Sequence, residues 1–193
     1  FALLKDGNIR AVENEILSSK ICRCFDCRQV LYEESMFDGQ KVSKSRIITS
    51  VDYSMVSMEA FEIYAANHDI HVMDFVLKLD AYSYYMMNLL DYLIGNTDRN
   101  WGNWGFLVDK RTTQPVRLFD LMDLNQTFLA YDTIEGANCM TTGNRKISQR
   151  EAAVEAVKNI GLNQKDEIKD EWFKGREKER EMFWCRFGIL KEQ

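Results

Sequence analysis

The sequence contains only one proline, Pro115, and only two histidines. Because proline interrupts helices, its scarcity beside many Glu, Lys, Met and Leu residues favours a largely helical chain. The shortage of histidines counts against a Ser-His-Asp hydrolase, and the glycines that surround a hydrolase nucleophile turn are also missing. The composition therefore favours helix and disfavours this class of enzyme.

Long apolar runs and an excess of positive charge are absent as well. No stretch approaches the roughly 18 uninterrupted apolar residues that a membrane-spanning helix needs, and no signal peptide is visible. The formal net charge is −5, from 25 Lys and Arg against 30 Asp and Glu. Surfaces that coat nucleic acid usually carry net positive charge. We therefore expect a cytoplasmic protein without membrane contact or direct nucleic-acid binding.

The cysteines and histidines do not form a convincing metal motif. Three of the five cysteines crowd between positions 22 and 27, and only Cys139 and Cys185 remain to supply a second zinc-binding pair. An odd number of cysteines without a secretion signal predicts reduced thiols. His68 and His71 lack a third ligand, so a surface or core position is favoured for both.

Length and composition predict a globular protein. Hydrophobic residues make up 46% and aromatic residues 12% of the chain, which excludes a disordered protein. A length of 193 residues suits one or two domains with a sizeable core. Because the chain begins at Phe1 rather than at methionine, we expect it to be a piece of a longer protein.

The first third of the sequence has the pattern of a small α+β unit. The stretch FALLK at 1–5 is typical of a buried strand, and the turn DGN follows it. Apolar residues on one broad face predict a helix over 10–24. Two short strands are expected at 28–34 and 40–50, with the turn FDGQ between them.

The middle of the sequence predicts two helices. Ser57 can cap a helix over 58–67, and Asp80 can cap a second helix over 81–94. The second helix is apolar almost all round, as a helix buried inside a larger lobe would be. Gly95 is placed to end it.

A hairpin and a helical tail complete the expected fold. Strands at 104–108 and 116–119 flank a polar turn. Further along the chain, Ser148 can cap and Gly161 can end another helix. The charged segment 163–190 is expected to be helical, with a solvated face and an apolar stripe of Trp172, Phe173, Met182, Phe183 and Phe187.

Three oxygen-bearing side chains are expected to converge beside the hairpin. Asn103 and Asp120 lie at its two open ends, and Asp98 precedes Asn103 by five residues. A carboxylate and a carboxamide oxygen suit a Mg²⁺ ion that also binds phosphate oxygens, and a further carboxylate nearby can accept a hydroxyl proton. This division of roles is the phosphoryl-transfer arrangement of kinases.

Two other interpretations of these residues stay open. An isolated Asp98 just after the end of a helix would be explained as a turn residue. The stretch FDLMDLN also offers Asp123 and Asn125 as a competing pair. Asp120 is preferred because it directly ends the second strand of the hairpin.

The segment LIGNTDRNWGNWGFLVDKRTTQPVRLFDLMD, at 93–123, resembles the catalytic segment of the HipA-like family of serine/threonine kinases, which are remotely related to phosphoinositide kinases. The family string is Asp-x-His-x-x-Asn in a Gly-Asn-Thr-Asp loop, followed by a strand pair that ends in aspartate. FALLKDG and AVENEI resemble the lysine strand of the family and the Asn-Glu helix behind it. The resemblance covers most of the chain and is strongest at 89–123.

The resemblance implies roles for the residues of the loop. Asp98 would orient and deprotonate the acceptor hydroxyl, while Asn103 and Asp120 would hold Mg²⁺ on the phosphates of ATP. Position 100 carries Asn100 where the family string has histidine. Asparagine can form hydrogen bonds but cannot carry the positive charge of an imidazolium, so we expect weakened nucleotide handling.

The resemblance also implies nucleotide-binding residues nearer the N-terminus. Lys5 would contact the α and β phosphates, with Glu15 as its counter-charge. Glu13 is an alternative partner on the same helix. The backbone between Ile48 and Ser50 would meet the adenine.

The implied fold is α+β and protein-kinase-like, of the type shared by HipA-like and phosphoinositide kinases. Residues 1–52 would form a partial small β lobe, and residues 53–193 a mainly helical catalytic lobe. Nothing before Lys5 supplies a loop that covers the phosphates, so we expect part of the small lobe to be missing.

The expected function is ATP-dependent transfer of the γ-phosphoryl group to a Ser or Thr hydroxyl of a protein substrate, with ATP and Mg²⁺ as cofactors. An alternative is a catalytically impaired kinase fold that serves as a protein-binding module, which Asn100 suggests. A weaker alternative is a small-molecule or lipid kinase, although an acidic chain without a basic membrane face disfavours lipid. Because some family members pair with an antitoxin, the resemblance also implies an antitoxin-type protein partner.

Overall fold

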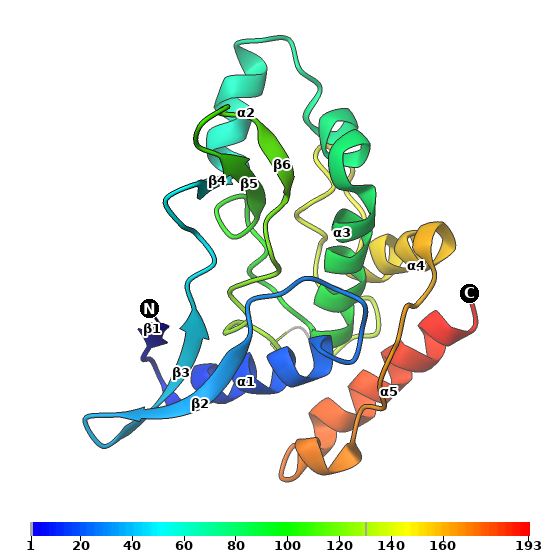
Figure 1. Ribbon diagram of the computed structural model, residues 1–193. Helices are drawn as coiled ribbons and strands as arrows, with labels where there is room; N and C mark the ends of the chain where they lie inside the picture. The colour runs from blue at the N-terminus through cyan, green and yellow to red at the C-terminus, as the bar shows by residue number, and fades with distance from the viewer. Residues whose placement is uncertain (1, 130) are drawn as a thin grey trace.

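The computed structural model describes residues 2–129 and 131–193, so Phe1 of the predicted first strand lies outside the described part. Figure 1 shows two small antiparallel sheets at opposite ends of a mixed α/β molecule, with a long helix beside the upper one. The mixed composition agrees with the predicted α+β class. None of the helices formed by the described residues has the length and hydropathy of a membrane span.

The first sheet has the strand order β1 (Ala2–Lys5), β3 (Gln40–Arg46), β2 (Tyr32–Phe37), and all pairs are antiparallel. Helix α1 (Ile9–Cys22) packs against β2 and β3. The side chain of Asn8 caps α1 by accepting a backbone N–H of its first turn. The predicted order of strand, helix, strand, strand is confirmed, but β2 begins four residues later than expected and β3 ends four residues earlier.

The second sheet has the order β4 (Tyr53–Ser57), β5 (Gly105–Asp109), β6 (Pro115–Leu118). Strands β5 and β6 are the predicted hairpin. Strand β4 was not predicted, and it pairs with β5 over its whole length. The segment 47–52 runs from the first sheet to the second along one side of the molecule (Figure 1).

The long helix beside the second sheet has a kink at Asp80, the predicted cap, and its first half before Asp80 was not predicted. Helix α2 (Met58–Ala66) is capped by Ser57, as predicted. Helix α3 (Val72–Ile94) contains Asp80 in a non-helical conformation, with φ −156° and ψ 63°. The Asp80 carboxylate accepts a backbone N–H of the following turn at 3.2 Å, so it caps the second half of α3 as predicted. Gly95 ends α3 in the left-handed region, with φ 59°.

The C-terminal part is helical in three pieces. Helix α4 (Gln149–Ile160) begins with a capping box at Ser148 and ends at Gly161, as predicted. A single turn η1 (Asp170–Phe173) and helix α5 (Glu177–Lys191) follow.

The prediction of a helix over the whole of 163–190 is wrong for its first part. Asn163 has a positive φ of 53°, which right-handed helices exclude. The backbone around it is bonded to the loop after α1 instead: the Asn163 carbonyl accepts the N–H of Asp26 at 2.9 Å, and Lys165 N–H donates to the Cys24 carbonyl at 2.7 Å. Bonds to a distant segment therefore replace the helix that the local sequence favours.

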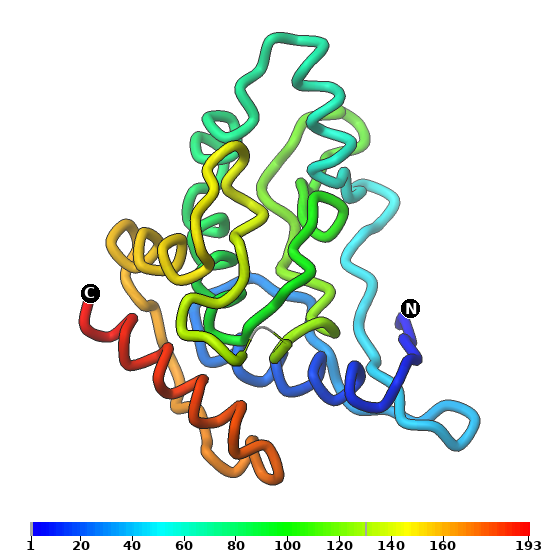
Figure 2. Tube along the Cα trace, turned by 180° about the vertical axis from the view of Figure 1, so that it is seen from behind, coloured from blue at the N-terminus to red at the C-terminus, as the bar shows by residue number. Residues whose placement is uncertain are grey.

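The core lies around the second half of α3. Leu89, Leu90 and Ile94 are fully buried, as the apolar helix predicted. Of the expected apolar stripe in the tail, Phe173, Phe183 and Phe187 are buried, while Trp172 and Met182 are partly exposed. Figure 2 shows α5 beside α1 from behind. Two ion pairs, Arg10 with Glu179 and Glu13 with Arg176, join the first half of α1 to the start of α5.

Neither the cysteines nor the histidines form a metal centre. Within residues 2–129 and 131–193, no group of three or more His, Cys, Asp or Glu side chains could hold a metal ion. All five cysteines are free thiols. His68 stacks on Tyr64 and His71 lies 3.1 Å from an Asp74 oxygen, so both imidazoles have local packing or pairing partners.

Candidate active site

The loop between α3 and β5 folds its carboxamides around Asp98. Asn96 accepts the backbone N–H of Asp98 through Oδ1 at 3.1 Å. Asn103 donates from Nδ2 to the backbone carbonyl of Asp98 at 2.8 Å and to its Oδ2 at 3.0 Å. The five-residue spacing therefore lets Asn103 close the loop onto the carboxylate of Asp98.

Asn100 holds the other oxygen of the same carboxylate. Its Nδ2 donates to Asp98 Oδ1 at 2.7 Å, and its Oδ1 accepts the backbone N–H of Gly102 at 2.9 Å. The carbonyl of Asn100 also accepts the N–H of Asn103 at 2.9 Å. The neutral carboxamide of Asn100 thus donates to Asp98 and accepts from Gly102, so it connects the residues before and after it in the loop.

Lys5 contacts acidic side chains from two segments that lie far apart in the sequence. Its Nζ lies 3.4 Å from Glu15 Oε1 on α1 and makes a shorter contact with Asp123 Oδ1. Glu15 is buried and also accepts the hydroxyl of Ser43, the residue that pairs with Lys5 across β1 and β3. Glu15, rather than the alternative Glu13, is therefore the partner of Lys5.

Burial and the neighbouring charges act in opposite directions on the pKa values of Lys5 and Glu15. Burial lowers the pKa of Lys5, but its bonds and charge interactions with Asp123 and Glu15 outweigh it, so the pKa is raised. Burial raises the pKa of Glu15, although the Ser43 hydroxyl and Lys5 act against the rise. The ammonium of Lys5 is accordingly the positive charge that compensates two acidic side chains here.

Asp123 reaches Lys5 because of an unusual backbone turn. Its φ is 56°, in the left-handed region that non-glycine residues rarely adopt. The backbone N–H of Asp123 donates to the hydroxyl of Tyr32 at 3.1 Å. Tyr32 lies on β2, so the turn after β6 is attached to the first sheet.

Asp120, the preferred metal ligand in the sequence interpretation, forms an ion pair with Arg117. Its Oδ1 accepts from Arg117 Nη1 at 2.5 Å. Asp120 and Asn103 border the same narrow cavity, of about 20 Å³, between α3 and the end of β6. The structure therefore brings Asp123, the alternative left open by the sequence, to Lys5, and leaves Asp120 paired with Arg117.

The residues expected at the adenine lie in the segment between the sheets. Ile48 borders a pocket of about 540 Å³ together with Leu31 and Arg46. The Ser50 hydroxyl accepts the backbone N–H of Tyr53 at 3.2 Å, and Lys110 Nζ donates to the Ser50 carbonyl at 2.7 Å. Hydrogen bonds thus fix the segment at Ser50, while Ile48 faces a pocket.

A buried ion pair beneath the loop was not anticipated. Arg99 and Asp91 are 3% and 5% exposed, and Arg99 Nε lies 2.8 Å from Asp91 Oδ2. Asp91 stands alone among the apolar residues of the second half of α3, because its neighbours from Met86 to Ile94 include no other charge. A single charge in a buried helix requires a partner. The isolated Asp91 was therefore the sequence signal that could have predicted this ion pair.

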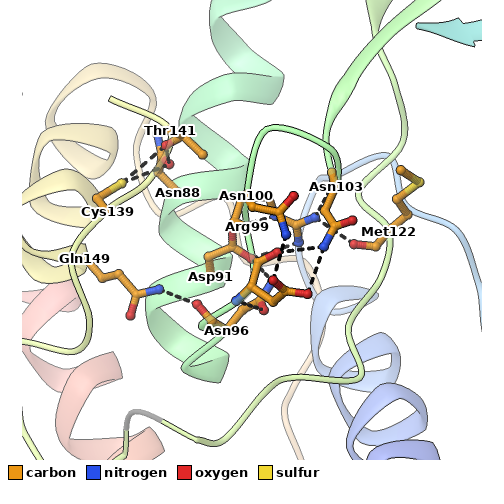
Figure 3. Close-up of polar contacts among 11 residues, drawn as sticks. Asn88, Asp91, Asn96, Arg99, Asn100, Asn103, Met122, Cys139, Thr141 and Gln149 are labelled. Carbon is orange, nitrogen blue, oxygen red and sulfur yellow. Dashed lines mark hydrogen bonds and ion pairs between the residues drawn. The ribbon is translucent and has the colours of Figure 1, made fainter. Parts of the chain in front are cut away.

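A polar network continues from this ion pair towards α4 (Figure 3). Gln149, at the start of α4, donates to the carbonyl of Asn96 at 2.5 Å. Asn88 accepts the hydroxyl of Thr141 at 2.5 Å and the thiol of Cys139 at 3.6 Å. The loop that carries Asp98 is therefore bonded to α3 and α4, and the segment before α4 is bonded to α3.

Comparison with known proteins supports the fold. The chain is similar in structure to the Helicobacter pylori proinflammatory kinase CtkA, with a TM-score of 0.67 and 14% sequence identity over 99% of this chain and 86% of that one. No protein-family model matches the sequence, and no curated protein matches it. At this identity the similarity establishes a kinase-like fold.

Proposed function

We propose that this chain is an ATP-dependent kinase of the HipA-like class that transfers the γ-phosphoryl group to a Ser or Thr hydroxyl of a protein. The observation that carries the proposal is the position of Lys5. Its ammonium meets Glu15 of α1 and Asp123 from a segment 118 residues away. A strand lysine between a helix glutamate and a later aspartate is the arrangement that positions phosphates in protein kinases.

Asp98 is the base in this proposal. Its carboxylate is held at both oxygens by the amides of Asn100 and Asn103, which fixes its direction. Carboxylate oxygens can each accept more than one hydrogen bond, so an acceptor hydroxyl can still donate to Asp98. The base would receive the hydroxyl proton as the new phosphoester bond forms.

Asn103 and Asp123 are the proposed Mg²⁺ ligands. Both bonds formed by the Asn103 side chain use its nitrogen, so Oδ1 is the atom available to a cation. The Asp123 carboxylate already lies against a positive charge, that of Lys5. One or two protein oxygens with phosphate oxygens and water suffice for Mg²⁺, so these donors fit. A bound Mg²⁺ would neutralise charge on the phosphate oxygens.

The remaining residues would bind ATP from the opposite lobe. Lys5 would leave Asp123 for the α and β phosphates while Glu15 keeps it oriented. The backbone from Ile48 to Ser50 would meet the adenine, next to the pocket that Ile48 borders.

A second candidate function is a kinase fold that binds a protein partner without catalysis. The observation that favours it is the pairing of Asp98, because the carboxamides of Asn100 and Asn103 engage both of its oxygens. Asn100 also brings no positive charge to the phosphates. In this case the chain would bind nucleotide weakly and would not transfer phosphate.

Nucleotide binding and transfer separate the two candidates. The melting temperature is measured with ATP and Mg²⁺, with ATP and EDTA, and with Mg²⁺ alone, and phosphorylated residues are then mapped by mass spectrometry. The kinase proposal expects a rise only with ATP and Mg²⁺ together, and phosphoserine or phosphothreonine on the chain or on an added protein. Absence of both effects would exclude the kinase proposal.

A further inference from the structure

We infer that Arg99 is a positioning residue of this site, because one guanidinium holds the two segments that carry the proposed metal ligands. The inference rests on the proposed function and adds to it a device that sets the distance between Asn103 and Asp123. Arg99 follows the proposed base directly in sequence, yet its side chain is buried beneath the loop.

The hydrogen bonds of Arg99 divide into two pairs (Figure 3). Nη1 donates to the carbonyl of Asn103 and to the carbonyl of Met122, both at 2.7 Å. Nε and Nη2 donate to the two oxygens of Asp91 at 2.8 and 3.0 Å. Arg99 therefore attaches the end of the catalytic loop and the turn after β6 to one point on α3.

The second of these carbonyls belongs to the peptide that leads into Asp123. The carbonyl of Met122 accepts from Arg99, and the N–H of the same peptide, on Asp123, donates to Tyr32 at 3.1 Å. Both ends of the peptide are thus held, one by Arg99 and one by Tyr32 of the first sheet. Because Asp123 has an unfavourable φ of 56°, these two bonds maintain the turn that directs its carboxylate to the site.

Only arginine can make this set of contacts. The guanidinium presents its donors in a planar fork, so two can face a carboxylate while two others face carbonyls. A lysine at position 99 would be a single point charge on a flexible stem. Asp91 supplies the counter-charge that a buried cation needs, and Asn96 Nδ2 donates to the same carboxylate at 2.9 Å.

Replacing Arg99 should change the Mg²⁺ dependence of ATP binding. Loosening the peptide before Asp123 should displace one metal ligand while Lys5 and the segment 48–50 stay in place. Residues that orient metal ligands typically change metal affinity by about 10- to 100-fold when they are replaced. A residue that only stabilises the fold would lower the melting temperature without changing the Mg²⁺ requirement of the folded protein.

The test measures the dissociation constant of ATP by calorimetry as Mg²⁺ is titrated, on the whole chain well below the melting temperature. The variants are Arg99→Lys and Tyr32→Phe, which removes only the hydroxyl that accepts the Asp123 N–H. Arg186→Lys is the control, because Arg186 is equally buried and donates to the carbonyls of Tyr92 and Thr133, which carry no proposed ligand.

We expect Arg99→Lys and Tyr32→Phe to raise the half-saturating Mg²⁺ concentration by about 10-fold or more, while Arg186→Lys leaves it unchanged. An unchanged Mg²⁺ requirement in Tyr32→Phe overturns the inference, even if Arg99→Lys does not fold. An equal increase in Arg186→Lys overturns it too, because the effect would then be common to buried arginines. If the unaltered chain binds no ATP at any Mg²⁺ concentration, the proposed function fails first and the inference falls with it.

Discussion

The carboxylate of Asp123 lies against the ammonium of Lys5, although 118 residues separate them in sequence. One residue comes from β1 and the other from the turn after β6, so their contact joins the first sheet to the segment that follows the hairpin. In the proposed function, Mg²⁺ and the phosphates of ATP would bind here and separate the two side chains. The proposed kinase site is built around this pair.

Replacing each of the two candidate aspartates separates their roles. Asp123→Asn should reduce Mg²⁺-dependent affinity for ATP by at least about 100-fold, because it removes a charged metal ligand. Asp120→Asn is the matched comparison and should lower that affinity much less, since Asp120 pairs with Arg117 instead. Calorimetric titration of both variants with ATP and Mg²⁺ measures the difference. The reverse order of effects would restore Asp120 as the metal ligand.

Asn100 should act through Asp98 and without a titrating group of its own. Asn100→Ala removes the donor to Asp98 Oδ1 and the acceptor of the Gly102 N–H, so the rate of phosphoryl transfer should fall roughly 10-fold, the value of one bond to a charged group. Asn100→His can still donate to Asp98, and an imidazole titrates near pH ~6.5. The pH–rate profile of Asn100→His should therefore gain a step in that region that the unaltered chain lacks.

If Asn100→Ala transferred phosphate at the rate of the unaltered chain, the carboxamide at position 100 would have no part in holding the base. The melting temperature of each variant, measured beside the rate, shows whether a slower reaction reflects the site or the fold.

Asp91→Asn should destabilise the protein strongly. The substitution leaves Arg99 charged, buried and without its counter-ion, and breaking a buried ion pair costs about 3–5 kcal/mol. The free energy of unfolding from urea titration at neutral pH measures the loss. Asp26→Asn is the comparison, because Asp26 pairs with Lys165 at the exposed surface and its loss should not measurably change stability. Equal effects of the two substitutions would contradict the account of the buried pair.

The cysteines should differ sharply in reactivity. Burial raises the pKa of Cys27 to about 12 and raises the pKa of Cys22 as well, so both thiols stay protonated near pH 8 and react poorly. Cys185 is exposed. Alkylation of the native protein at pH 8 should therefore label Cys185 first, and all five cysteines should react only after unfolding. Rapid labelling of Cys22 in the native state would contradict its burial.

Local signals in the sequence were sufficient for much of the fold. The caps at Ser57, Asp80 and Ser148 and the end of α3 at Gly95 were predicted correctly, because a cap depends on a few neighbouring residues. The β5–β6 hairpin was also found, since its turn and strands are contiguous. By contrast, β4 exists only through its pairing with β5 across an intervening α2 and α3, and no local pattern specifies such a partner.

The site shows the same division. Asp98 and Asn103 were expected to lie close together in one short loop, and their side chains are hydrogen-bonded; the bond from Asn100 to Asp98 was not predicted. The contact of Asp123 with Lys5 depends on the left-handed turn at Asp123 and on Tyr32, which lies 91 residues away. No local pattern could anticipate a backbone conformation held by distant side chains, and Asp120 stays the metal ligand that the sequence alone predicts.

Transfer of labelled γ-phosphate is the most direct test of the proposed function. The unaltered chain and Asp98→Asn are incubated with γ-labelled ATP and Mg²⁺, with and without an added protein acceptor, and ATP affinity is measured on the same samples. We expect the unaltered chain to label serine or threonine, and Asp98→Asn to transfer about 10²- to 10⁴-fold more slowly with the same ATP affinity, as the loss of a general base requires. Equal labelling by both chains, or none by either, would contradict Asp98 as the base of a kinase.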